Sequence, residues 1–182
     1  IERISPQFSA SITGDSIAGC YNLLVNRQVH LDREQNYYHS AIKILSSNAM
    51  RDLSNIEISF DPEYQKLLLH KLNIVRDGTV INKLSNSDIQ ILQREENMDR
   101  HLYDGRLTAI VNVTDVRIDD IIDYSFSIVG FNPVFEGHFS DRIYTHYSTP
   151  IEHFCFRLIA PKEKKMITEL YNGATAPIIQ RS

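Results

Sequence analysis

Apolar and polar residues alternate along much of the chain, beginning with the stretch from residue 21 to residue 31. The apolar positions here are Tyr21, Leu23, Val25, Val29 and Leu31, and the polar ones are Asn22, Asn26, Gln28 and His30. Successive side chains of an extended chain point to opposite faces, so this pattern predicts a strand with one buried face. After a polar loop at 32–36, a second alternating run with Tyr38, Ile42 and Ile44 predicts the other half of a β-hairpin.

Further β-type runs follow, and they are separated by polar turns. They lie at 56–60, 67–75, 79–82, 107–113, 118–129, 139–147, 153–158 and 166–171. Gly78 marks a tight turn between two of these runs, because glycine tolerates positive φ. Two short helices are expected, at 47–53 and at 87–96. The second is predicted from Ser87 as N-cap and Gln90 as the residue that reaches back to it.

This order of elements predicts an all-β fold, an antiparallel β-sandwich of about nine or ten strands with one or two short helices. Residues 1–16 are expected to form an N-terminal extension and residues 17–171 the sandwich. Residues 172–182, which include Ala174–Pro177, have the composition of a linker.

Composition fits a soluble globular domain. The chain has 182 residues, of which 42% are hydrophobic and 23% charged, and this is enough for one domain with a sizeable core. The formal net charge of −4 argues against general binding of nucleic-acid phosphates, which needs a basic surface. The chain begins at Ile1 without an apolar signal-peptide core, so a mature form or an excised fragment is expected.

The segment 113–124, with the sequence VTDVRIDDIIDY, holds four aspartates and is the first candidate for chemistry. A calcium loop needs closely spaced oxygen ligands and a glycine, but this segment has no glycine and is interrupted by isoleucines. A turn followed by a strand is the preferred interpretation. Asp120 would lie in the turn and Asp115 could pair with Arg117. Asp119 and Asp123 would face water, and Ile122, Tyr124, Phe126 and Ile128 would face the core.

The two cysteines, Cys20 and Cys155, form no CxxC motif, and a single disulfide between them is possible but has no support in the sequence. Cys155 lies two residues from His153. Side chains two apart on a strand are rooted about 6.5–7 Å from each other, so a catalytic Cys–His pair is not favoured over simple packing. The seven histidines form neither HxH nor HExxH; they are His30, His39, His70, His101, His138, His146 and His153. No catalytic, cofactor-binding or metal-binding residue is therefore assigned.

The order and spacing of several segments resemble those of a known protein family. The segments are 60–67, 75–80, 102–107, 115–125 and 132–135. Over about residues 20–160 the chain resembles a bacterial domain of unknown function that precedes transglutaminase-like domains in larger exported or membrane-linked proteins. Where that family usually has Gly-Asp, this chain has Asp119-Asp120, and Asp119 is expected to adopt the left-handed conformation that aspartate tolerates better than most residues.

The resemblance implies a sandwich distantly similar to the N-terminal sandwich domains of zinc aminopeptidases. It also implies a following papain-like domain with a Cys-His-Asp triad, of which Cys20 and Cys155 match no position. The expected function is a non-catalytic accessory domain that positions that catalytic domain or binds a protein or peptide substrate. The expected location is periplasmic or exported, with no cofactor and no nucleic-acid partner.

An alternative rests on the aspartates and on Phe131–Phe135, where aromatic residues flank a turn. It is a ligand- or glycan-binding sandwich module, with or without the assistance of a metal ion. A third hypothesis, a stand-alone cysteine hydrolase, would require Cys155 as nucleophile.

Overall fold

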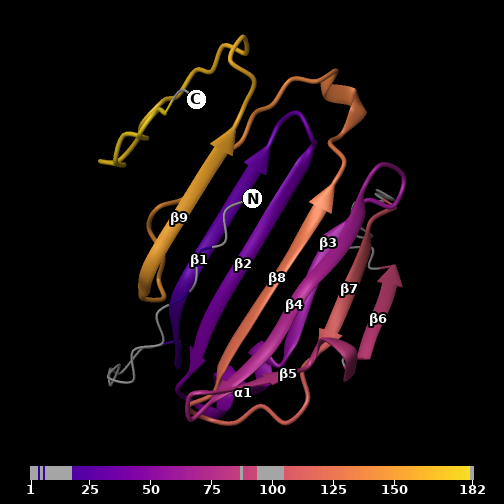
Figure 1. The fold of residues 1–182 in the computed structure, drawn as a ribbon, viewed down its shortest axis with the longest axis vertical. Coiled ribbons are helices and arrows are strands. Elements are labelled where there is room, and N and C mark those ends of the chain that lie inside the picture. The colour runs from indigo at the N-terminus through magenta and orange to yellow at the C-terminus, as the bar shows by residue number, and fades with distance from the viewer. Residues whose placement is uncertain (1–3, 5, 7–17, 87, 94–104, 181–182) are drawn as a thin grey trace, which may run out of the picture.

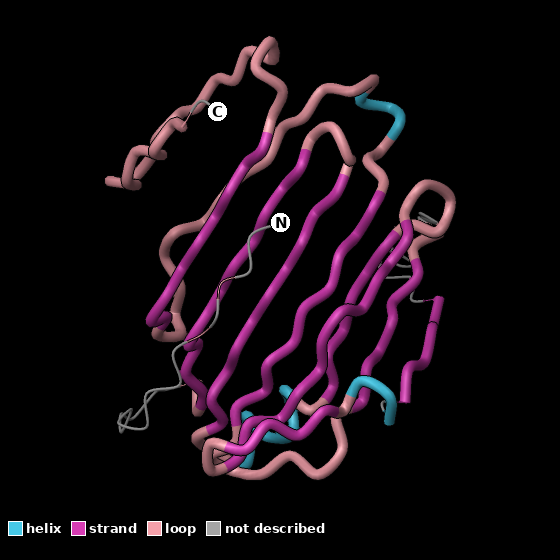
Figure 2. The backbone as a smooth tube through the Cα atoms, in the orientation of Figure 1, coloured by secondary structure: helices cyan, strands magenta, loops and turns pink. Residues whose placement is uncertain are grey.

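The computed structural model describes residues 4, 6, 18–86, 88–93 and 105–180, and within them the chain forms two β-sheets (Figures 1 and 2). The larger, sheet A, has six strands in the order β5-β4-β8-β2-β1-β9. They are β5 (Thr79–Asn82), β4 (Lys66–Arg76), β8 (Ile121–Val129), β2 (Gln35–Ile44), β1 (Cys20–His30) and β9 (Ile151–Ile159). The smaller, sheet B, has the order β3-β7-β6. Its strands are β3 (Asn55–Phe60), β7 (Leu107–Asn112) and β6 (Asp88–Gln93).

The two sheets confirm the predicted all-β sandwich. Neighbouring strands are antiparallel, except for β1 and β9, which run parallel with Asn22 opposite Ile151. The helix α1 (Ser47–Leu53) connects β2 to β3, and its N-cap Ser46 accepts a hydrogen bond from the Ala49 amide. Two short 3₁₀ turns complete the described elements, Leu84–Asn86 and Pro133–Phe135. No helix in the described residues is long and apolar enough to cross a lipid bilayer.

The main core lies between sheet B and part of sheet A. Ile56 and Ile58 of β3 and Val111 of β7 pack with Leu72, Ile74 and Ile122 from β4 and β8. Each such side chain contributes about 1.5–3 kcal/mol when it is fully removed from water. In Figure 1, β9, β1 and β2 lie clear of the strands of sheet B. Sheet B therefore covers only part of the inner face of sheet A.

A bulge in β1 changes which of its side chains are buried. The pairing of β1 with β2 shifts between Asn22 and Leu24, so Leu23 and Leu24 are both buried although they are adjacent. After this shift, Asn26 and Gln28 lie on the outer face of sheet A, the face that points away from sheet B, and both are buried. The prediction that these polar residues face solvent was therefore wrong.

Three predicted segments differ from the structure. The segment expected to be a helix contains the strand β6, which pairs with β7 over all six of its residues, whereas Ser87 and residues 94–96 lie outside the described residues. Residues 139–147 and 166–171 were predicted as strands, but neither forms one. The other predicted strands and the helix at 47–53 are confirmed, as is the turn at Asp77-Gly78, whose φ angles are 49° and 75°.

Candidate functional site

The aspartate-rich segment is held by two arginines. Asp120 is almost completely buried, and its carboxylate accepts two hydrogen bonds from Arg76, from Nε and Nη2, each 2.8 Å long. The same carboxylate accepts a third bond from the Arg117 amide at 2.8 Å, which closes the turn before β8. A bidentate arginine on a buried carboxylate is a strong, geometrically specific pair. Asp120 thus belongs to the turn as predicted, but it is also an anchor for β4.

Asp115 completes this cluster at the surface. Its carboxylate accepts from Arg76 Nη1 at 3.1 Å and from Arg117 Nη2 at 3.0 Å. These hydrogen bonds, first from Arg76 and then from Arg117, lower the pKa of Asp115 below its ordinary value. The predicted pairing of Asp115 with Arg117 is confirmed. Asp119 is exposed and has a φ of 72°, so its predicted left-handed conformation is also confirmed.

Asp123 contradicts its prediction, because it is 4% exposed rather than solvated. It lies on the outer face of sheet A, where its Oδ1 is 2.7 Å from His39 Nε2 and its Oδ2 accepts from Lys71 Nζ at 3.1 Å. The partners come from β2 and β4, the two strands that flank β8. A buried carboxylate is stable here because an ion pair and a hydrogen bond replace its hydration. Ile122 is buried and Tyr124 and Phe126 pack against the core, as predicted.

A row of polar side chains crosses the outer face of sheet A beside Asp123 and includes its partner His39. The register places Asn26, His39 and Ser125 side by side on β1, β2 and β8, with Cys155 and Lys71 at the two ends of the row. Asn26, His39 and Ser125 are all buried. Asn26 Nδ2 and His39 Nδ1 have no hydrogen-bond partner. The alternation of residues within a single strand could not identify this row, since its members come from five different strands.

A second polar group lies one row further along the same face. Ser127 is fully buried and bonds with Gln35 Nε2 at 2.8 Å and with His70 Nε2 at 2.7 Å. Burial lowers the pKa of His70, because an imidazolium ion is less well solvated there. This part of the outer face of sheet A is therefore a layer of hydrogen-bonded polar side chains. An apolar cluster lies at the other end of the same face. That cluster contains Leu23, Leu24, Ala41, Val75 and Ile121, against which Ile4 packs.

Neither Cys20 nor Cys155 forms a disulfide, and burial raises the pKa of Cys20. Cys155 and His153 occupy alternate positions of β9, and Cys155 is separated from His39 by the strand β1 that carries Asn26. His138 and His146 lie in the loop between β8 and β9, and both are exposed. Among the described residues, no three side chains suited to metal binding lie together.

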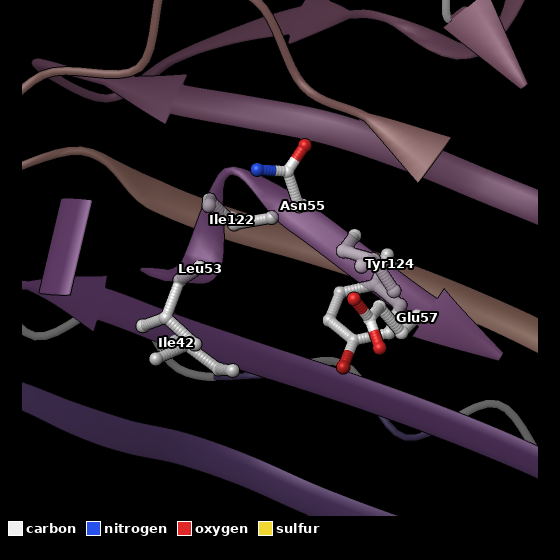
Figure 3. A pocket seen from close by; sticks show the side chains of 7 residues that line it. Ile42, Leu53, Asn55, Glu57, Ile122 and Tyr124 are labelled. Atoms are coloured by element: carbon white, nitrogen blue, oxygen red, sulfur yellow. The ribbon is translucent and has the colours of Figure 1, made fainter. Parts of the chain in front are cut away.

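A cavity of about 210 Å³ lies beside β3, which is the terminal strand of sheet B among the described residues (Figure 3). Its floor consists of Ile42 from β2 together with Ile122 and Tyr124 from β8, and Leu53 of α1 borders one end. The opposite wall is the edge strand β3, and the residues that line the cavity there are Asn55, Ile56 and Glu57. Burial raises the pKa of Tyr124, and its hydrogen bond with Ser40 opposes that shift. The sequence did not point to this cavity.

Aromatic side chains continue the floor of the cavity along the inner face of sheet A. Tyr38 of β2 stacks on Phe126 of β8 with ring centroids 4.9 Å apart. The guanidinium of Arg27 lies 5.4 Å from the Tyr38 ring centroid and 5.9 Å from that of Phe156. Arg27 also forms a 2.5 Å ion pair with Asp141 of the loop between β8 and β9. Arg27, Tyr38, Phe126 and Phe156 are half-buried, whereas Asp141 is exposed.

The fold is that of an all-β sandwich domain with two unequal sheets. Residues 32–182 match a protein family described as a Domain of Unknown Function with solved structure (DUF3857), and the chain belongs to that family. This agrees with the predicted resemblance to a domain of unknown function. No curated protein sequence matches the chain.

Solved structures add a likeness in fold. A protein of Parabacteroides distasonis titled a "putative protease" is 19% identical, with a TM-score of 0.51, over 63% of this chain and 23% of that chain. Yeast LTA4 hydrolase in complex with bestatin is 19% identical over 68% of this chain and 17% of that chain, with a TM-score of 0.27. The chain thus spans less than a quarter of the length of these proteins.

Proposed function

We propose that this chain is a non-catalytic accessory domain of a larger exported protein. Its role is to pack against a transglutaminase-like cysteine catalytic domain and to position that domain or a protein substrate. Two findings support the proposal. The chain belongs to a domain family, and the protease-titled structure that shares its fold is several times longer than the matched region. The exported location and the transglutaminase-like partner are inferred from the sequence resemblance.

The observation that carries this proposal is the apolar surface of the C-terminal segment. Residues 160–180 form neither helix nor strand, yet Ile178 and Ile179 are 89% and 81% exposed, and Ile167 and Tyr171 are also largely exposed. Burying one such isoleucine would gain about 1.5–3 kcal/mol. These four residues lie in one segment of the chain, and exposed apolar surface commonly marks a place where another protein makes contact. A domain that adjoins this segment would cover them.

The test uses the full-length protein. The double substitution Ile178→Ser with Ile179→Ser should lower its thermal stability and its catalytic rate on a protein substrate. Deletion of residues 18–160 should do so more strongly. Ile118→Ser is the matched control, because Ile118 is a half-exposed isoleucine in the turn before β8 and should have little effect. Unchanged folding, rate and substrate preference after the deletion would exclude an accessory role.

The metal-assisted alternative gains no support from its own residues. Asp115 and Asp120 are already bonded to Arg76 and Arg117, so a cation would have to displace two guanidinium groups. The Phe131–Phe135 segment folds into a short 3₁₀ turn in which Asn132 accepts a hydrogen bond from the Val134 amide. This arrangement explains the turn without a ligand.

A further inference from the structure

We propose that Asn172 is a site of spontaneous deamidation, at which its side-chain amide is converted to a mixture of aspartate and isoaspartate. The site is the turn Tyr171–Ala174, in the segment that follows β9 (Figure 1). The conversion replaces a neutral amide by a carboxylate, so each modified molecule gains one negative charge. The inference goes beyond the proposed function and does not rest on it, because the reaction needs only this chain and water.

The sequence of the turn favours this reaction. Deamidation begins when the backbone nitrogen of the following residue attacks the side-chain carbonyl carbon of the asparagine. Glycine has no Cβ, so it lets the backbone approach more closely than any other residue does. Asn172-Gly173 is the only Asn-Gly pair in the chain. Among the asparagines, Asn172 is therefore the one at which this attack meets the least steric resistance.

The geometry of the turn leaves the attacking nitrogen outside its closing hydrogen bond. Asn172 and Gly173 have φ angles of 53° and 74°, as in the type I′ turn that Asn-Gly pairs favour. The turn is closed by the Ala174 amide, which donates to the Tyr171 carbonyl oxygen at 3.1 Å. The Gly173 amide takes no part in that bond. The turn does not itself hold the reacting nitrogen back.

The surroundings of the turn allow the chain to rearrange. Asn172 and Gly173 are exposed, and a Cβ atom added to Gly173 would meet no atom within 4 Å. Residues 160–180 form neither helix nor strand, so the turn can open without breaking the pairing of a sheet. Exposed segments of this kind open locally at little cost in free energy. Opening lets the backbone rotate until the Gly173 nitrogen reaches Asn172 Cγ.

The bond changes balance with water as the only co-reactant. The Gly173 nitrogen bonds to Asn172 Cγ and gives its proton to the solvent, while Nδ2 leaves as ammonia. The product is a cyclic imide that contains Cγ and the main-chain carbonyl carbon of residue 172. Water then opens the ring at one of these two carbons. Attack at Cγ gives aspartate, whereas attack at the main-chain carbon gives isoaspartate, in which the backbone runs through Cβ and Cγ.

Two other positions in the chain serve as internal controls. Asp77 and Gly78 form a turn with similar φ angles of 49° and 75°, but that turn joins the paired strands β4 and β5. An ionised carboxylate is also a poor target for the nitrogen, because it has no amine to release. Asn132 is followed by Pro133, whose nitrogen carries no hydrogen to lose. Both positions should stay unchanged while Asn172 reacts.

The test is to incubate the purified 182-residue chain at 37 °C and to take samples over time at pH 6 and pH 8. Ion-exchange chromatography separates molecules that have gained a negative charge. Trypsin releases residues 166–181 as one peptide, whose mass locates the change. An isoaspartyl methyltransferase labels isoaspartate, which direct hydrolysis of the amide does not produce. Both products are expected in this peptide, and more rapidly at pH 8, because the attacking nitrogen must lose its proton.

Two variants and a peptide separate the roles of sequence and structure. Asn172→Gln should abolish the reaction, since glutamine would have to close a larger ring. Gly173→Ala should slow it roughly tenfold, because a methyl group crowds the attacking nitrogen. The turn is exposed, and circular dichroism should show both variants folded. A synthetic peptide of residues 166–181 gives the rate without the fold, and the chain should react within a factor of about ten of it.

Several outcomes would overturn the inference. They are an unchanged 166–181 peptide while other sites react, aspartate without isoaspartate, and equal rates for Gly173→Ala and the natural sequence. A chain that reacts more than about a hundredfold more slowly than the synthetic peptide would also overturn it, since the turn would then protect Asn172. None of these results depends on a second domain, so they leave the test of the accessory role separate.

Discussion

The carboxylate of Asp123 on β8 lies between His39 on β2 and Lys71 on β4, at 2.7 Å from His39 Nε2 and 3.1 Å from Lys71 Nζ. Together, the three side chains link three adjacent strands of sheet A across its outer face. The pair with His39 is almost fully buried, whereas the Lys71 side chain is 35% exposed. Asp123 thus forms a largely buried polar interaction that connects neighbouring strands, and it is not a surface ion pair.

Replacing Asp123 should destabilise the domain. Asp123→Asn keeps the size of the side chain but loses the charge that pairs with Lys71, and we expect a loss of about 2 kcal/mol in the free energy of unfolding. Asp119→Asn is the control, since Asp119 is exposed and asparagine tolerates its positive φ; its effect should stay within about 0.5 kcal/mol. Urea unfolding followed by circular dichroism measures both. Equal effects would show that burial of Asp123 contributes nothing.

Asp120 should matter more, because three hydrogen bonds end on its buried carboxylate. Asp120→Ala removes the anchor for Arg76 and the cap of the turn, and a loss of about 3 kcal/mol is expected. Asp115→Asn, at the exposed end of the same cluster, should cost much less. Chemical unfolding of the two variants in parallel gives the comparison. A small effect for Asp120→Ala would mean that Arg76 is held by Asp115 alone.

Acid should weaken the turn before β8. The arginine hydrogen bonds depress the pKa of Asp115 in the folded state below its ordinary value of 3.8. A group with a depressed folded pKa contributes stability that is present above its unfolded pKa and is lost as the pH falls through its folded pKa. The contribution of Asp115 is therefore complete at neutral pH and declines below about pH 4. Unfolding free energies between pH 7 and pH 3 should fall less steeply in Asp115→Asn; identical slopes would contradict the assignment.

Gly130 should not tolerate a side chain. It has a φ of 112°, and a Cβ atom there would lie 1.9 Å from the Tyr64 carbonyl oxygen. Gly130→Ala should cost about 3 kcal/mol from backbone strain and the clash together. Gly78→Ala has a comparable positive φ of 75° but open space around it, so about 1 kcal/mol is expected. Thermal unfolding separates the two, and similar melting points would refute the clash.

Strands could be predicted from the sequence where the local residue pattern agrees with the pairing of strands in the sheet. The bounds of β3, β5 and α1 were predicted to within about one residue. The alternation along β3 and the Asp77-Gly78 turn before β5 are local signals. β6 was missed because Ser87-Asp88-Ile89-Gln90 imitates the start of a helix, whereas pairing with β7 decides the conformation. Residues 139–147 include β-favouring residues such as Ile143 and Tyr144, but among the described strands none pairs with this segment.

The polar layer could not be predicted for a different reason. The alternation of side chains along a strand predicts which residues share a face with Asp123 or with Asn26. It does not predict whether polar side chains from other strands lie on that face. His39 and Asp123 are 84 residues apart in sequence, and the register of β2 with β8 brings them together. The cavity beside β3 likewise depends on how far sheet B extends over sheet A, which no local pattern encodes.

The parallel pairing of β1 with β9 has a mechanical consequence. β1 is the first strand among the described residues and β9 the last, and they lie side by side from Asn22 opposite Ile151 to His30 opposite Ile159. Because they run in the same direction, a pull on residues 20 and 159 draws the strands past each other and loads their hydrogen bonds together in shear. Held between two other domains, this one would resist stretching at that pair of strands. Force spectroscopy should show one high-force rupture there rather than gradual unzipping.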